Sequence, residues 1–136
     1  MIDWYRSFSY IDRLIIMLIS MIFLHNIADY LVQTKFIAKF KQRKNWEEYD
    51  TKGYYKYDYI VILLVHSFSW SIITFFPILF EFQNVMDYSI IVIGNTLIHA
   101  YIDDLKCNKL KINLIQDQLI HILQIVLIFI LFVIIN

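Results

Sequence analysis

Long apolar stretches and short polar connectors follow one another along this chain. The apolar stretches run over residues 12–33, 59–80, 85–103 and 114–135, and a helix needs about 20 such residues to cross the hydrocarbon core of a bilayer. The third stretch gives the weakest signal because Asp87, Asn95 and His99 interrupt it. The pattern predicts an all-α fold in which residues 1–136 form one integral membrane domain, a four-helix transmembrane bundle.

Composition supports a membrane protein and excludes a disordered or disulfide-rich chain. Apolar residues make up 60% of the sequence, which contains 2 glycines and 1 proline, and the connectors are too short to build a separate soluble core. Cys107 is the only cysteine, so an intrachain disulfide and a cysteine-based metal motif are both excluded. The first apolar stretch is too long for a secretory signal and no small-residue cleavage site follows it, so we expect a retained helix.

The basic residues are distributed unevenly between the two ends of the predicted helices. Ten of the 12 lie in the connectors after the first and third helices, and the opposite side holds only Arg6 and Arg13. Because positive connectors stay in the cytoplasm, we expect both long connectors to be cytoplasmic. The chain termini and the turn around residues 77–87 are then outside the inner (cytoplasmic) membrane.

The four histidines fall one on each predicted helix. They are His25, His66, His99 and His121. Three of them have an aspartate four residues away, as His25/Asp29, His99/Asp103 and Asp117/His121, and this spacing places both side chains on one helix face. An ionisable group inside a bilayer costs roughly 2.5 to 3.5 kcal/mol on insertion scales, so such groups need partners.

The histidines are also predicted to share one depth. At 1.5 Å per residue, each lies roughly 7 to 13 Å from the cytoplasmic end of its helix, with the aspartates about one turn nearer that end. We therefore expect a buried polar His/Asp chamber in the cytoplasmic half of the bundle. Apolar packing should close the outer half, where residues 126–135 are almost wholly apolar.

Five separated strings resemble one known family. The strings are HNIADYLVQT, AKFK, LLVHS, HAYIDDLK and DQLIH, between about Leu24 and Leu123. Their order and spacing resemble the small bacterial and phage integral membrane proteins catalogued as domain-of-unknown-function family 3307. The resemblance implies a class but no biochemical activity, and it implicates His25, Asp29, Gln33, His66, His99, Asp103, Lys106, Asp117, Gln118 and His121.

The chemistry of these side chains favours a metal site. Imidazole and carboxylate suit a divalent transition metal, with zinc first and iron, manganese or nickel as alternatives. The predicted ligands are His25, His66, His99, His121, Asp29, Asp103 and Asp117, enough for two ions or for one ion with outer carboxylates. Two other interpretations stay open: a chamber that handles protons or ions, and buried His–Asp pairs that only hold helices together.

The metal interpretation predicts a hydrolase. Asp29 or Asp103 would take a proton from water, and Gln33 and Gln118 would stabilise developing negative charge. Lys39 and Lys106, or Lys41 in place of Lys39, would hold the phosphate of an anionic substrate, a phosphoester or lipid headgroup, which the basic connectors would attract. The alternative is a non-enzymatic effector that moves protons or ions or perturbs the bilayer in phage–host conflict. The expected partners are the lipid bilayer and, as a possible homo-oligomer, further copies of the chain, with no nucleic acid.

Overall fold

The computed structural model describes residues 2–50, 52–81 and 85–135, and these residues form helices and connecting turns without a strand. This confirms the all-α prediction. In chain order the elements are α1 (Ile2–Arg6), α2 (Tyr10–Ile27), the π-helical turn η1 (Ala28–Val32), α3 (Lys35–Phe40), α4 (Arg43–Tyr49), α5 (Asp58–Phe75), the 3₁₀ turn η2 (Phe76–Phe80), α6 (Val85–Cys107) and α7 (Leu114–Ile135).

Four helical segments are long and apolar enough to cross a membrane. They are Tyr10–Val32, Asp58–Phe80, Val85–Cys107 and Leu114–Ile135. The predicted ranges agree within two residues except at the end of α6, which continues four residues beyond Asp103. The extension matters for the site because it places Lys106 on the helix, three residues from Asp103 and on the same face.

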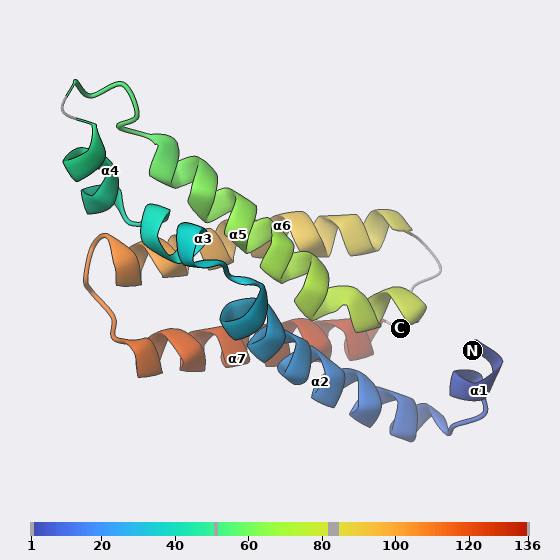
Figure 1. Cartoon of the computed structure of the whole chain (residues 1–136). Helices are drawn as coiled ribbons and strands as arrows, with labels where there is room; N and C mark the ends of the chain where they lie inside the picture. Colours follow the sequence, from blue (N-terminus) through green and yellow to red (C-terminus); the bar gives the residue numbers. More distant parts are fainter. Residues whose placement is uncertain (1, 51, 82–84, 136) are drawn as a thin grey trace.

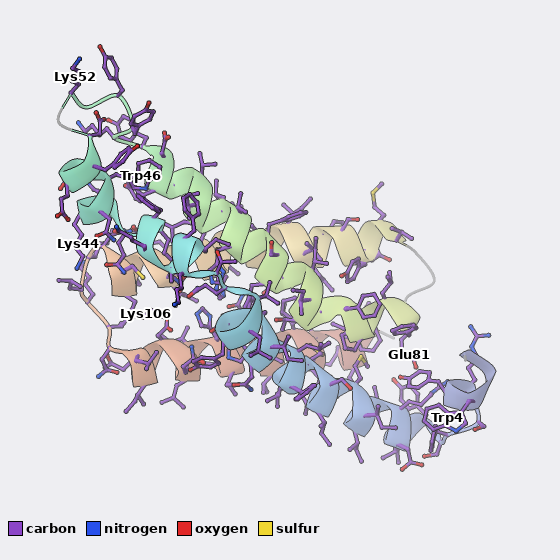
Figure 2. The ribbon with its side chains drawn as sticks, in the orientation of Figure 1. Trp4, Lys44, Trp46, Lys52, Glu81 and Lys106 are labelled. Atoms are coloured by element: carbon purple, nitrogen blue, oxygen red, sulfur yellow. The ribbon has the colours of Figure 1, made fainter. Side chains whose placement is uncertain are left out.

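The long helices lie against one another with the chain passing back and forth between two ends (Figure 1). α2 contacts α5 and α7, α5 packs along α6, and α6 packs on α7. The two chain termini lie at one end together with η2, and α3, α4 and the turn between α6 and α7 lie at the other. Figure 2 shows Trp4 and Glu81 at the first end and Lys44, Lys52 and Lys106 toward the second.

An apolar core fills the half of the molecule nearer the termini. Its buried members include Met17, Met21, Phe75, Ile125 and Phe132. Outward-facing side chains on the same helices are also large and apolar, among them Ile19, Phe23, Ile93, Leu119 and Leu127. A helix that is apolar both inside and outside is typical of a chain surrounded by lipid.

The first long helix does not end as the sequence predicts. α2 widens into the π turn η1, and the chain becomes extended at Gln33 before Thr34 caps α3 through a hydrogen bond of 3.3 Å from the Ile37 N–H. The first long helix therefore runs over Tyr10–Val32, with a π-helical last turn. Single π turns often mark functional sites, and this one carries Asp29.

Candidate functional site

The four histidines, each on a different long helix, meet in one buried cluster. The ring centroids of His99 and His121 are 4.1 Å apart, those of His66 and His99 5.3 Å, and those of His25 and His121 5.9 Å. None of the four is more than 3% exposed. The structure thus brings together the residues that the depth calculation placed in one layer.

The three aspartates border this cluster on the side of α3 and the α6–α7 turn. Nε2 of His66 lies 3.5 Å from Oδ2 of Asp103 and 4.0 Å from Oδ1 of Asp29. Nε2 of His121 lies 3.4 Å from Oδ1 of Asp117. Asp103 and Asp117 are buried, and Asp29 is nearly so.

Within the described part of the chain, two overlapping sets of side chains could hold a metal ion. Asp29, His66 and His99 form one set, and His99, Asp103 and His121 form the other. In each set the potential ligand atoms all lie within 4.8 Å of one another. Because His99 belongs to both sets, five side chains surround one small region.

Two of these imidazoles have no hydrogen-bond partner for either nitrogen. Nδ1 and Nε2 of His99 and Nδ1 of His121 are buried without a partner, and Nε2 of His121 makes no hydrogen bond although Oδ1 of Asp117 lies 3.4 Å away. A buried polar atom without a partner costs about 1 to 3 kcal/mol, so three such atoms in one place need an explanation. A cation bound between the rings would provide one, and the residues present fit it, since imidazole and carboxylate are the usual ligands of zinc, iron and manganese.

His25 is different, because both of its ring nitrogens are engaged. The indole N–H of Trp70 donates to Nδ1 of His25 at 2.9 Å, and Nε2 lies 3.1 Å from Oε1 of Gln118. An indole nitrogen can only donate, so Nδ1 is the acceptor, and Nε2 carries the proton and donates to Gln118. In this geometry no lone pair of His25 is left for an ion, so the structure does not bring His25 into the candidate ligand sets.

Gln118 continues this chain of hydrogen bonds to two carboxylates. Its amide nitrogen donates to Oδ2 of Asp29 at 3.0 Å and to Oδ2 of Asp117 at 3.2 Å. Both amide hydrogens are thus used. Gln118 therefore has no free donor for the developing negative charge that the sequence analysis expected it to stabilise. Its observed role is to hold Asp29 and Asp117 in place, while His25 fixes the amide orientation.

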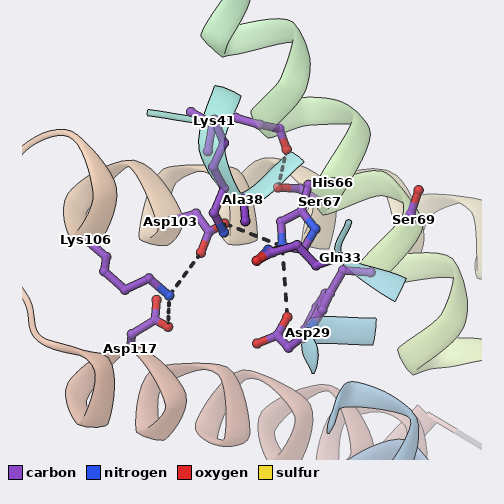
Figure 3. Close-up of polar contacts among 12 residues, drawn as sticks. Asp29, Gln33, Ala38, Lys41, His66, Ser67, Ser69, Asp103, Lys106 and Asp117 are labelled. Carbon is purple, nitrogen blue, oxygen red and sulfur yellow. Dashed lines mark hydrogen bonds and ion pairs between the residues drawn. The ribbon is translucent and has the colours of Figure 1, made fainter. Parts of the chain in front are cut away.

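Two lysines pair with two of the aspartates (Figure 3). Nζ of Lys41 lies 2.6 Å from Oδ2 of Asp103, and both side chains are buried. Nζ of Lys106 pairs with Asp117 and lies 3.7 Å from Oδ1 of Asp103. Three carboxylates against two ammonium groups leave one formal negative charge, which falls on Asp29.

Lys39, predicted to bind a substrate phosphate, is not part of the cluster. Its side chain is exposed, with Nζ 5.4 Å from the ring centroid of Phe40. Lys41 enters the cluster in its place, because α3 ends at Phe40 and the chain turns inward at this C-cap residue. The sequence alone offered both lysines and no reason to choose between them.

A small polar cavity connects the cluster with the surface. Its volume is about 130 Å³, which is room for several water molecules or one small anion. The lining residues are Asp29, Tyr30, Gln33, Lys41, Asp103, Lys106, Leu114 and Gln118. Tyr30 and Leu114 are exposed and mark the rim, while Asp29 and Asp103 lie at the histidine end. Nε2 of Gln33 lies 3.1 Å from Nε2 of His66, so this predicted polar residue also belongs to the wall.

Sequence reasoning missed two buried partners. Trp70 follows His66 by four residues, and this spacing was the available signal that it faces the same interior. Gln124 on α7 donates to Oδ1 of Asn95 on α6 at 2.6 Å, deeper in the apolar half. Asn95 had been noted only as an interruption of an apolar stretch, because the partner of a lone polar residue depends on how the helices pack.

No protein-family model matches the chain, and comparisons with curated proteins and with solved structures found no significant match. The resemblance to family 3307 accordingly remains a prediction.

Proposed function

We propose that this chain is an integral membrane four-helix bundle that binds a divalent transition metal ion, zinc first, among His66, His99, His121, Asp29 and Asp103. Its orientation would follow the basic connectors, with the termini outside and the cavity facing the cytoplasm. Carboxylate–imidazole sites between facing helices are a recurring feature of helical bundles.

One observation carries the proposal: both nitrogens of His99 and Nδ1 of His121 are buried without a partner, beside carboxylates. If the His–Asp pairs were only structural, few buried ring nitrogens would lack a partner, because each pair would hydrogen-bond them. The formal charge also favours a cation, since the three carboxylates and two ammonium groups of the cluster leave a charge of minus one.

We further propose metal-dependent hydrolysis of an anionic ester, a phosphoester or lipid headgroup. A bound ion would supply Lewis acidity and lower the pKa of water toward neutrality. Asp29 is the general base that fits best, because Oδ1 has no hydrogen-bond partner and the residue lines the cavity. Lys106, about one-quarter exposed at the cavity wall, supplies positive charge for the substrate.

A non-enzymatic role in proton or cation handling is the second candidate. The observation in its favour is the continuous chain of hydrogen bonds from Trp70 through His25 and Gln118 to Asp29. Such a chain also suits a membrane effector in phage–host conflict. It does not account for the unpaired nitrogens of His99 and His121, so we place it second.

Elemental analysis of protein purified without a metal-affinity tag tests the metal site directly. We expect at least one zinc, iron or manganese ion per chain, lost with a chelator and regained on addition. Release of phosphate from a phosphoester and from a phospholipid, before and after chelation, then tests the hydrolase. A chain that neither carries nor takes up an ion contradicts both proposals, whereas an ion without turnover removes only the enzyme.

A further inference from the structure

Lys41 occupies an unusual position for a residue of a polar connector. Among the described residues between Gln33 and Tyr57, it is the only one that is buried. Its side chain is 6% exposed, yet it carries an ammonium group into the interior. Burying an unpaired charge is very costly, so this side chain is held there by what it meets.

The group that it meets is a candidate metal ligand. Oδ2 of Asp103 receives Nζ of Lys41 at 2.6 Å, and Asp103 also belongs to the set with His99 and His121. Nε2 of His66 lies 3.5 Å from the same oxygen. The ammonium group of Lys41 and a metal ion would therefore compete for the same carboxylate group.

The connector is otherwise held to α6 by few polar contacts. Nδ2 of Asn108 donates to the Lys41 carbonyl at 3.3 Å, and the Arg43 N–H donates to Oδ1 of Asn108 at 2.7 Å. Within α4, the Arg43–Glu47 pair is local and exposed. The buried Lys41–Asp103 pair is thus the principal charged attachment of α3 and α4 to the cluster.

We propose that Lys41 is a built-in competitor of the metal ion, and that ion binding releases it from Asp103 together with the α3–α4 connector. This regulatory inference rests on the proposed metal site. With Lys41 in place the cluster has a formal charge of minus one; with a divalent ion and without Lys41 it is neutral. The exchange therefore avoids a net buried charge.

Release of Lys41 would also change the cavity. Lys41 forms part of the cavity wall, so its departure would widen the cavity toward the connector. The freed ammonium group then stands at the mouth, where it can pair with an anionic substrate. The chamber would open to substrate only after the ion has been loaded.

Zinc titration of Lys41→Met and Lys39→Met in nanodiscs, against a chromophoric competing chelator, tests the competition. Lys39 is the matched control because it lies two residues away but is exposed. We expect K41M to bind zinc about tenfold more tightly than wild type or better, and K39M to stay within about twofold. Equal affinities for K41M and K39M would overturn the proposal.

Hydrogen–deuterium exchange of the wild-type protein supplies a test that does not depend on any variant folding. Adding zinc should accelerate exchange over residues 35–49, and in K41M this segment should exchange fast with or without zinc. Unchanged or slower exchange on zinc addition would contradict the release. If the wild type binds zinc, but K41M does not bind it more tightly and exchange over residues 35–49 does not accelerate, only the proposed role of Lys41 is contradicted. If the wild type takes up no zinc in the titration, the metal site and the competition are both contradicted.

Discussion

The indole N–H of Trp70 donates a hydrogen bond of 2.9 Å to Nδ1 of His25. This contact distinguishes His25 from the other three histidines, because it fixes the proton on Nε2 and removes the free lone pair. His25 thereby becomes the start of a chain through Gln118 to Asp29 and Asp117. His25 therefore differs in chemical role from the other three histidines of the cluster because of Trp70, a residue on another helix.

The first prediction separates ligands from the residues that orient them. His99→Gln or His121→Gln should abolish stoichiometric ion binding, because each removes a ring with unpaired nitrogens from the proposed site. His25→Gln should retain the ion with affinity reduced about 10- to 100-fold, as is usual for outer-shell partners. Ion content and titrated affinity in detergent, with helicity checked by circular dichroism, measure both. Loss of the ion in H25Q to the same extent as in H99Q would contradict the assignment.

The second prediction concerns Asp29, the aspartate of the histidine cluster that forms no ion pair with a lysine. In the presence of chelator, Asp29→Asn should unfold at the same denaturant concentration as wild type or a higher one, because it removes an uncompensated charge while keeping a hydrogen-bonding side chain. Asp103→Asn should lose about 3 kcal/mol, because it leaves the ammonium group of Lys41 without its buried partner.

Equilibrium unfolding followed by circular dichroism compares these two variants. Ion titration of D29N should also show weakened binding, and its turnover of an anionic ester should fall. A metal-free D29N that is markedly less stable than wild type would show that Asp29 serves the fold rather than the ion.

The third prediction concerns orientation. In a Cys107→Ser background, a cysteine at Lys52 should not react with a membrane-impermeant maleimide added to intact cells, whereas a cysteine at Ser7 should react. Both positions are exposed. Figure 2 shows Lys52 at one end of the molecule, and Ser7 lies in the turn between α1 and α2, which is at the other end in Figure 1. The expectation follows from the excess of basic residues around Lys52, which favours a cytoplasmic location for that end. The reverse labelling pattern would invert the proposed topology.

The fourth prediction concerns the Gln124–Asn95 pair in the apolar half. Gln124→Leu leaves Oδ1 of Asn95 without its 2.6 Å partner and should destabilise the chain, and Asn95→Leu should do the same. The double variant should recover part of the loss, with a coupling free energy of about 0.6 to 1.7 kcal/mol, the range of hydrogen bonds between membrane helices. Additive effects in unfolding measurements would mean that the pair contributes nothing beyond its separate contacts.

The sequence by itself determined the four apolar helices, because hydrophobic runs of this length are a local property of the chain. The spacing of four between His99 and Asp103, and between Asp117 and His121, likewise placed each pair on one helix face from helix geometry alone. These residues were therefore identified as interior polar groups before their neighbours were known.

Tertiary structure alone decided which of these groups are partners. Trp70 donates a hydrogen bond to His25, and Lys41 rather than Lys39 pairs with Asp103. Gln118 donates both amide hydrogens to carboxylates. Each choice depends on the rotation and approach of helices distant in sequence, and on where α3 ends. A lone pair is free or occupied according to atoms less than about 3.5 Å away, and no periodicity along one helix contains that information.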